Sequence, residues 1–245
     1  MTTKCWSWLL LPALVFVSIA ASAQDAEEIL VKIDRNLTPE SFEAYRKLIN
    51  IEPDGRSREY ILFMVKKGKD KVASVFLSPA SDKGRATLRL GDNMWLYIPD
   101  VGKPIRITSL QSVVGGVFNN ADILRLDYHV EYSVKELQQT GEEYVLDLRA
   151  RSSSVAYDRL RMTAAKNTLL PTKIECFAAS GLLIKTIYFK EPKVFEGITR
   201  PAVIETDSPL HKGYKSIMVY ANIKAKEFPD EVFTLTFLPR LETLR

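Results

Sequence analysis

The stretch that decides the fold is residues 91–107, GDNMWLYIPDVGKPIRI. Turn residues bracket two short runs in which apolar side chains occupy every second position, a pattern typical of antiparallel β-strands. We therefore predict that this stretch forms one hairpin of a large antiparallel sheet.

Similar runs recur along most of the chain and are separated by turn dipeptides such as Ser180-Gly181 and Lys212-Gly213. Ten or more short strands without intervening helices predict a sandwich or barrel rather than a parallel α/β sheet. The further predicted strands cover residues 42–50, 58–67, 72–77, 85–90, 126–134, 144–149, 157–164, 172–178, 182–189, 201–206 and 214–221.

Few helices are expected. Residues 25–37 carry apolar side chains at helical spacing, with Asp25 and Glu27 in the first turn, where the helix dipole favours negative charge. Asn119 and Asn120 can cap a short helix over residues 121–126. Residues 232–241 fit either a short helix or an extended strand.

The N-terminus has the pattern of a secretory signal. Lys4 precedes the apolar residues 6–20, and Ala21-Ser22-Ala23 provides the small residues of a cleavage site. We expect residues 1–23 to be a signal peptide cleaved after Ala23, and residues 24–245 to be a single domain. An uncleaved anchor is the weaker alternative because the apolar stretch is short and contains Pro12.

The composition limits the partners and the cross-links that can be expected. The 34 basic and 30 acidic residues are interspersed, which does not favour a nucleic-acid partner. Cys176 is the only cysteine after the expected signal, so no internal disulfide can form. The basic run at residues 66–71 is interpreted as a solvated turn, with contact to anionic lipid as the alternative.

No catalytic motif is recognisable, and we expect neither an enzyme nor a cofactor. One arrangement could hold a metal: if residues 126–134 form a strand, Asp127, His129 and Glu131 lie on one face of it. A polar outer strand face in water is the simpler interpretation. The Ser152-Ser153-Ser154 run is interpreted as a loop.

Residues 78–124, SPASDKGRATLRLGDNMWLYIPDVGKPIRITSLQSVVGGVFNNADIL, resemble the outer-membrane lipoprotein-sorting family, whose members include LolA/LolB-like periplasmic lipoprotein carriers. The resemblance extends over nearly the whole mature chain. It implies a mainly β fold with a few helices: a highly curved, open antiparallel β-barrel with an N-terminal helix and a short lid helix. Acyl chains are expected to lie between the sheet and the lid.

The resemblance directs the search for a ligand cleft to the alternating apolar positions. The expected lining is Leu62, Met64, Phe76, Leu88, Leu90, Met94, Leu96, Ile98, Ile105 and Ile107. The expected lid contacts are Val114, Val117, Phe118, Ile123 and Leu124, with Gly115 and Gly116 as flexible points or a simple turn. The alternation does not show which face of the sheet is concave, so Trp95 and Tyr97 are the alternative to Met94 and Leu96.

The expected function is a soluble periplasmic carrier that shuttles a lipoprotein or lipid between an inner-membrane transporter and the outer membrane. An ABC-type or RND-type transporter and an outer-membrane acceptor are the partners that the resemblance implies. The alternative is an envelope sensor, similar to RseB, or an accessory subunit of a transporter, in either case without catalytic activity.

Overall fold

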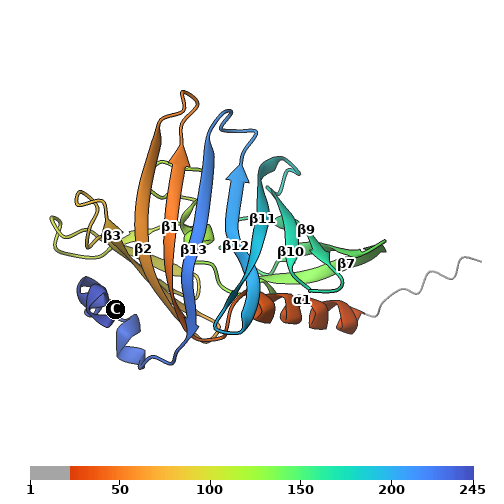
Figure 1. Cartoon of the computed structure of the whole chain (residues 1–245), viewed down its shortest axis with the longest axis horizontal. Helices are drawn as coiled ribbons and strands as arrows, with labels where there is room; N and C mark the ends of the chain where they lie inside the picture. The colour runs from red at the N-terminus through yellow and green to blue at the C-terminus, as the bar shows by residue number, and fades with distance from the viewer. Residues whose placement is uncertain (1–22) are drawn as a thin grey trace, which may run out of the picture.

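The computed structural model of the protein describes residues 23–245 and is built on one antiparallel sheet of 13 strands (Figure 1). The first six strands are β1 (Phe42–Ile51), β2 (Ser57–Lys67), β3 (Lys71–Ser78), β4 (Ala86–Leu90), β5 (Asn93–Tyr97) and β6 (Ile105–Ile107). The other seven are β7 (Tyr132–Thr140), β8 (Glu143–Ala150), β9 (Arg159–Ala165), β10 (Pro171–Phe177), β11 (Leu183–Phe195), β12 (Ile198–Asp207) and β13 (Lys215–Ala225). The hairpin expected in residues 91–107 is β5 and β6.

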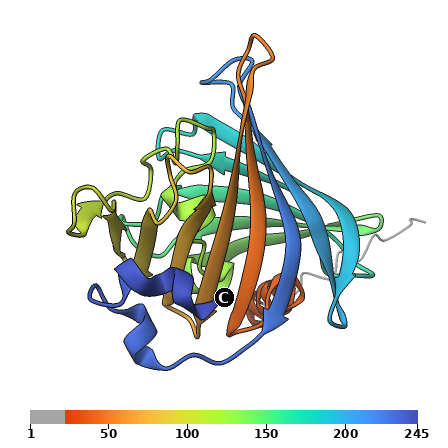
Figure 2. The same ribbon diagram turned by 60° about the vertical axis from the view of Figure 1, so that its left-hand side comes forward.

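The strand order explains how the sheet obtains a lid. The order is β6-β5-β4-β3-β2-β1-β13-β12-β11-β10-β9-β8-β7, so consecutive strands β6 and β7 lie at opposite edges. The chain between them, residues 108–131, must cross from one edge to the other, and the curved sheet wraps around it (Figure 2). We call residues 108–131 the lid. The sheet remains open, which confirms the expected curved, open antiparallel architecture.

The N-terminal helix is confirmed as α1 (Ala23–Leu37). Its apolar stripe of Leu30, Ile33 and Leu37 is fully buried, and the helix contacts β7, β12 and α3 (Tyr128–Glu131). The expected signal peptide lies outside the described residues, apart from Ala23. Within residues 23–245, no helix combines the length and the apolar character that a membrane span requires.

The lid contains two short helices instead of one. Asn119 caps α2 (Asn120–Ile123), as its sequence position predicts, and forms a reciprocal capping box with Asp122. The strand expected over residues 126–134 is wrong in its first half, where α3 lies. The carboxylate of Asp34 on α1 accepts hydrogen bonds from the backbone N–H groups of Tyr128 and His129 at 2.8 and 2.9 Å, which stabilises a helical turn there.

The C-terminal residues cover part of the outer face. Two 3-10 helices, η1 (Asp230–Phe233) and η2 (Leu238–Leu244), replace the single helix or strand left open for residues 232–241. They pack against β3 and β4 on the convex side, opposite the lid (Figure 2). We call residues 226–245 the C-terminal cover.

Candidate functional site

The register of β4 and β5 decides which face of the sheet is concave. Leu88 pairs with Trp95, and both pack in the outer apolar cluster beneath the C-terminal cover. Arg89 pairs with Met94, which belongs to the inner cluster under the lid. Directly paired residues of an antiparallel sheet point to the same side, so the face of Met94 is concave and that of Trp95 is convex.

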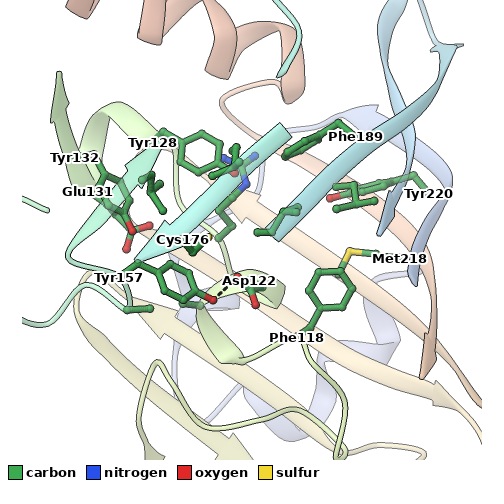
Figure 3. Close-up of a pocket in the computed structure, with 17 residues that line it drawn as sticks. Phe118, Asp122, Tyr128, Glu131, Tyr132, Tyr157, Cys176, Phe189, Met218 and Tyr220 are labelled. Atoms are coloured by element: carbon green, nitrogen blue, oxygen red, sulfur yellow. Dashed lines mark hydrogen bonds between the residues drawn. The ribbon is translucent and has the colours of Figure 1, made fainter. Parts of the chain in front are cut away.

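A cavity lies between the lid and strands β9 to β13 (Figure 3). Water-sized spheres fit within about 50 Å³ of it, and its empty space reaches about 640 Å³ when the part open to solvent is counted. The enclosed part holds a few water molecules at most. The apolar lining includes Phe118, Leu160, Ile174, Ile187, Phe189 and Met218, and the polar lining includes Asp122, Arg125, Glu131, Tyr157 and Tyr220.

Most of the residues expected to line the cleft pack elsewhere. Only Phe118 is shared with this cavity. The inner core between the sheet and the lid contains four of the expected lining residues, Leu62, Met64, Phe76 and Met94, and three of the expected lid contacts, Phe118, Ile123 and Leu124. Ile107 and Val114 pack against this core.

The strand register and the burial of the side chains show where the other expected residues lie. Leu88 and Leu90 lie with Trp95 and Tyr97 on the outer face. Leu96 and Val117 are buried outside the cavity lining. Ile98 lies in the turn after β5 and Ile105 is 40% exposed on the edge strand β6, so neither reaches the cavity.

Three buried cationic side chains hold the lid by its backbone. Both terminal nitrogens of Arg46 on β1 donate to the carbonyl oxygen of Ile123 at 3.1 Å. Arg89 donates to the carbonyl oxygen of Leu124 at 3.2 Å and pairs with Glu131. Lys185 on β11 donates to the carbonyl oxygen of Val117 and to Asp122 at 2.8 Å. The lid is therefore bound to the sheet by polar contacts as well as by apolar packing.

A second polar network connects α2 to the segment that precedes β9. The side-chain nitrogen of Asn119 donates to the Tyr157 hydroxyl at 2.8 Å. That hydroxyl donates to Asp122 at 3.0 Å (Figure 3). Burial first, and then the nearby Asp122 carboxylate, raise the pKa of Tyr157 well above its ordinary value. Tyr157 therefore remains a neutral donor at physiological pH.

The paired glycines lie where the lid comes closest to β1. A Cβ atom at Gly116 would lie 2.1 Å from the side-chain oxygen of Asn50, so any larger residue would force the Asn50 side chain to move. Gly115 has a φ of +79°, which favours glycine for a different reason. Ser216 on β13 links the two segments, because it donates to Asn50 at 2.7 Å and accepts from the backbone N–H of Val117 at 2.8 Å. Gly116 is thus a packing requirement as well as a turn.

An aromatic ring between two arginines borders the cavity. The guanidinium carbon of Arg200 lies 3.7 Å from the ring centre of Tyr220, and that of Arg46 lies 5.8 Å away. Burial raises the pKa of the Tyr220 phenol, but Arg200, Arg46 and Arg125 together lower it to about 7. Tyr220 is therefore able to ionise near neutral pH.

The site offers little for covalent or metal chemistry. Within residues 23–245 no group of histidine, cysteine and carboxylate side chains is arranged to hold a metal ion. Because α3 interrupts the expected strand, Asp127, His129 and Glu131 do not share a strand face; Asp127 pairs with Lys66 at 3.0 Å and His129 with Asp34 at 2.9 Å. Burial raises the pKa of the Cys176 thiol in the cavity wall well above its ordinary value, which keeps it unreactive.

The residues that sequence reasoning missed are the buried charges. Arg46, Lys185 and Arg200 stand in strands at positions that alternate with apolar residues, so the strand period places these charges on the apolar face. One signal was available: charged residues occur at intervals of two among apolar neighbours, as at Arg46 between Ala44 and Leu48, on the side that should be buried.

A single curved sheet whose edges are connected by a lid across the concave face is the fold of LolA-like proteins. A LolA superfamily protein from Nitrosomonas europaea is 28% identical, with a TM-score of 0.79 over 89% of this chain and 100% of that one. A putative outer membrane lipoprotein-sorting protein domain from Vibrio parahaemolyticus is 17% identical, with a TM-score of 0.77 over 89% and 100% of the two chains. A DUF1329 family protein from Desulfovibrio piger is 20% identical, with a TM-score of 0.76 over 88% and 98%.

A family model described as "Uncharacterized protein" matches residues 68–240, and the chain belongs to that family. No curated protein sequence matches the chain. The resemblance to the outer-membrane lipoprotein-sorting family and the LolA-like fold are both confirmed by the similar structures.

Proposed function

We propose that the protein is a non-catalytic periplasmic carrier that holds acyl chains between its sheet and its lid. The observation that carries this proposal is the cavity under the lid, whose apolar wall is formed by residues of β9 to β13 and by Phe118. Transfer of an acyl chain from water into such a wall stabilises the complex by about 0.8 kcal/mol per buried methylene group. The LolA-like fold of the similar structures supports the same assignment.

Release requires that the closed form be reversible. The contacts of Arg46, Arg89 and Lys185 with lid carbonyl oxygens are hydrogen bonds that water or a ligand can replace. A lid held by apolar packing alone would open only if the hydrophobic core were disrupted. An inner-membrane ABC-type or RND-type transporter as donor and an outer-membrane acceptor complete the proposed route. The cargo is a lipoprotein or another lipid.

The direct test is to purify the protein from its native envelope and to identify bound lipid or acylated polypeptide by mass spectrometry. A protein that carries no lipid and that also accepts none from vesicles would contradict the carrier function.

Fluorescence quenching supplies a second test with an internal control. In protein produced from Gln24 onward, Trp95 is the only tryptophan, and it packs in the outer cluster. Phe189 lines the cavity. Brominated acyl lipid should quench a Phe189→Trp variant made in a Trp95→Phe background and should leave Trp95 of the unmodified protein unquenched. Equal quenching of both positions would place the lipid outside the cavity.

A further inference from the structure

Two arginines beside the cavity are buried without a carboxylate partner. Arg200 is 1% exposed and Arg46 is 3% exposed. Other strongly buried cations in the described part of the chain have one: Lys66 pairs with Asp127, Arg89 with Glu131 and Lys185 with Asp122. Among residues 23–245, no ion pair with a carboxylate is formed by Arg46 or Arg200. The region around them carries excess positive charge in a setting of low polarity.

Their hydrogen-bonding capacity is also incomplete. One terminal nitrogen of Arg200 and the Nε nitrogen of Arg46 are buried and have no hydrogen-bond partner. A buried, unpaired polar group is costly, and an unpaired charge is more costly still. The Tyr220 ring lies close to both guanidinium groups, and one phenolate cannot balance two arginines.

Tyr220 is the member of this cluster that lines the main cavity; Arg46 and Arg200 do not line it. Tyr220 lines the main cavity and also a smaller hollow that Arg46 and Arg125 share. Arg200 lies two and four residues before Ala202 and Ile204 on β12, so it points to the same face as Ile204, which lines the main cavity. Figure 3 shows Tyr220 and Met218 at one end of the cavity, and Tyr132 and Glu131 at the other. Apolar wall therefore extends away from a cationic end.

From this arrangement we infer that the cavity binds an acyl amphiphile with an acidic headgroup, whose anionic oxygens pair with Arg200 and Arg46 beside Tyr220. The inference rests on the proposed carrier function and narrows its cargo to acidic lipids. Guanidinium groups bind carboxylate and phosphate oxygens through strong, charge-assisted hydrogen bonds, and the acyl chain then lies along the apolar wall. An anion offsets the buried charge that the protein itself leaves unpaired.

The test compares headgroups on one chain length. Dodecanoic acid, dodecyl phosphate and dodecanol are titrated against the mature protein loaded with a neutral fluorescent acyl probe. Displacement by the acid and the phosphate at concentrations at least tenfold lower than by the alcohol is expected. Equal potency of the acid and the alcohol would overturn the inference and leave the carrier function intact. Failure of all three, including the neutral alcohol, would count against the carrier function itself.

A second set of titrations uses free anions without an acyl chain. Acetate and inorganic phosphate should not displace the probe or compete with dodecyl phosphate at comparable concentrations. Competition by inorganic phosphate as strong as that of dodecyl phosphate would show a site for a free anion, which would overturn the inference of an amphiphile.

Variants assign the preference to the cluster. Arg200→Met should reduce the potency ratio of acid to alcohol to near one, and Arg200→Lys should retain part of the preference. Arg58→Met, at the exposed end of β2, is the matched control and should keep the full ratio. A full ratio in a folded Arg200→Met protein would contradict the assignment. If that variant does not fold, the Arg200→Lys variant and the comparison of headgroups on the unmodified protein still decide the question.

Discussion

The two faces of the sheet are covered in different ways. On the outer face, the C-terminal cover packs apolar side chains against the sheet, including Phe228, Phe233, Leu238 and Leu241. On the inner face, the lid has apolar contacts too, but its backbone carbonyl oxygens are held by Arg46, Arg89 and Lys185. An apolar cover is lost only when its side chains return to water, whereas polar contacts can be exchanged for others. From this difference we expect the inner layer to open more readily than the outer layer.

The largest effect should come from breaking the outer layer. Phe233 is 3% exposed, and we expect Phe233→Ala to lower the free energy of unfolding by about 3–5 kcal/mol, because the truncation leaves a cavity. Urea unfolding followed by circular dichroism measures the change. Leu235→Ala is the control, since Leu235 is 39% exposed and its loss should change stability by less than about 0.5 kcal/mol. Similar losses for both variants would mean that the cover is not anchored by its buried ring.

Breaking the inner layer should have a smaller and more local effect. Arg46→Met removes both hydrogen bonds to the Ile123 carbonyl oxygen. We expect the free energy of unfolding to fall by about 1–3 kcal/mol. Amide hydrogen exchange should become faster in residues 117–127, while exchange in β3 and β4 stays unchanged. The matched control is Lys47→Met, the next residue along β1, whose side chain is 38% exposed. Faster exchange throughout the sheet would show that the contact supports the whole fold and is not specific to the lid.

The ionisation of Tyr220 provides a sharper probe of the inner layer. Its pKa should be about 7 in the folded protein, against an ordinary value of 10. Tyrosinate absorbance in the near ultraviolet should therefore rise by one residue near neutral pH, and Tyr220→Phe should abolish that step. A protein in which every tyrosine ionises near pH 10 would show that the arginine cluster does not act on the phenol.

The same shift has a consequence for stability. The pKa of Tyr220 is lower in the folded protein than in the unfolded chain. The contribution of Tyr220 to the free energy of unfolding therefore grows by about 1.4 kcal/mol per pH unit between about pH 7 and about pH 10. It is complete above the unfolded pKa and is lost as the pH falls through the folded pKa. The quantity to measure is the difference in unfolding free energy between the unmodified protein and Tyr220→Phe across this range. A difference that is flat or that falls with rising pH would contradict the shift.

The smallest effect is expected at the rim of the outer layer. Asp230 pairs with Lys67 and Lys71 at 2.8 Å, and its side chain is 70% exposed. Hydrogen bonds from the two lysines lower the pKa of Asp230 to about 2, but exposed ion pairs contribute little to stability. Asp230→Asn should leave the unfolding midpoint close to that of the unmodified protein, and any difference should shrink at high salt. A large, salt-independent loss would show that the cover depends on this ion pair.

Much of the sheet could be predicted from alternation, and the errors have identifiable causes. Residues 128–131 were expected to be extended, but the Asp34 carboxylate, 94 residues earlier in the chain, accepts hydrogen bonds from the backbone of this segment. Leu88 was assigned to the cleft together with Met94, and only the pairing of Leu88 with Trp95 shows that it faces outward. The expected lining of the cleft favoured β2 to β6, whereas the cavity lies against β9 to β13.

The sequence by itself determined the periodicity of the strands, the amphipathic N-terminal helix and the cap at Asn119, because these depend on neighbours within a few positions of the chain. Only the tertiary structure decided which face is concave, that β1 pairs with β13, and that Arg46 and Arg200 flank Tyr220 inside. Alternation is the same whichever face curves inward, and the curvature of a sheet is set by pairings between strands that are distant in sequence. The charge of the candidate cavity is likewise a property of side chains brought together from separate strands.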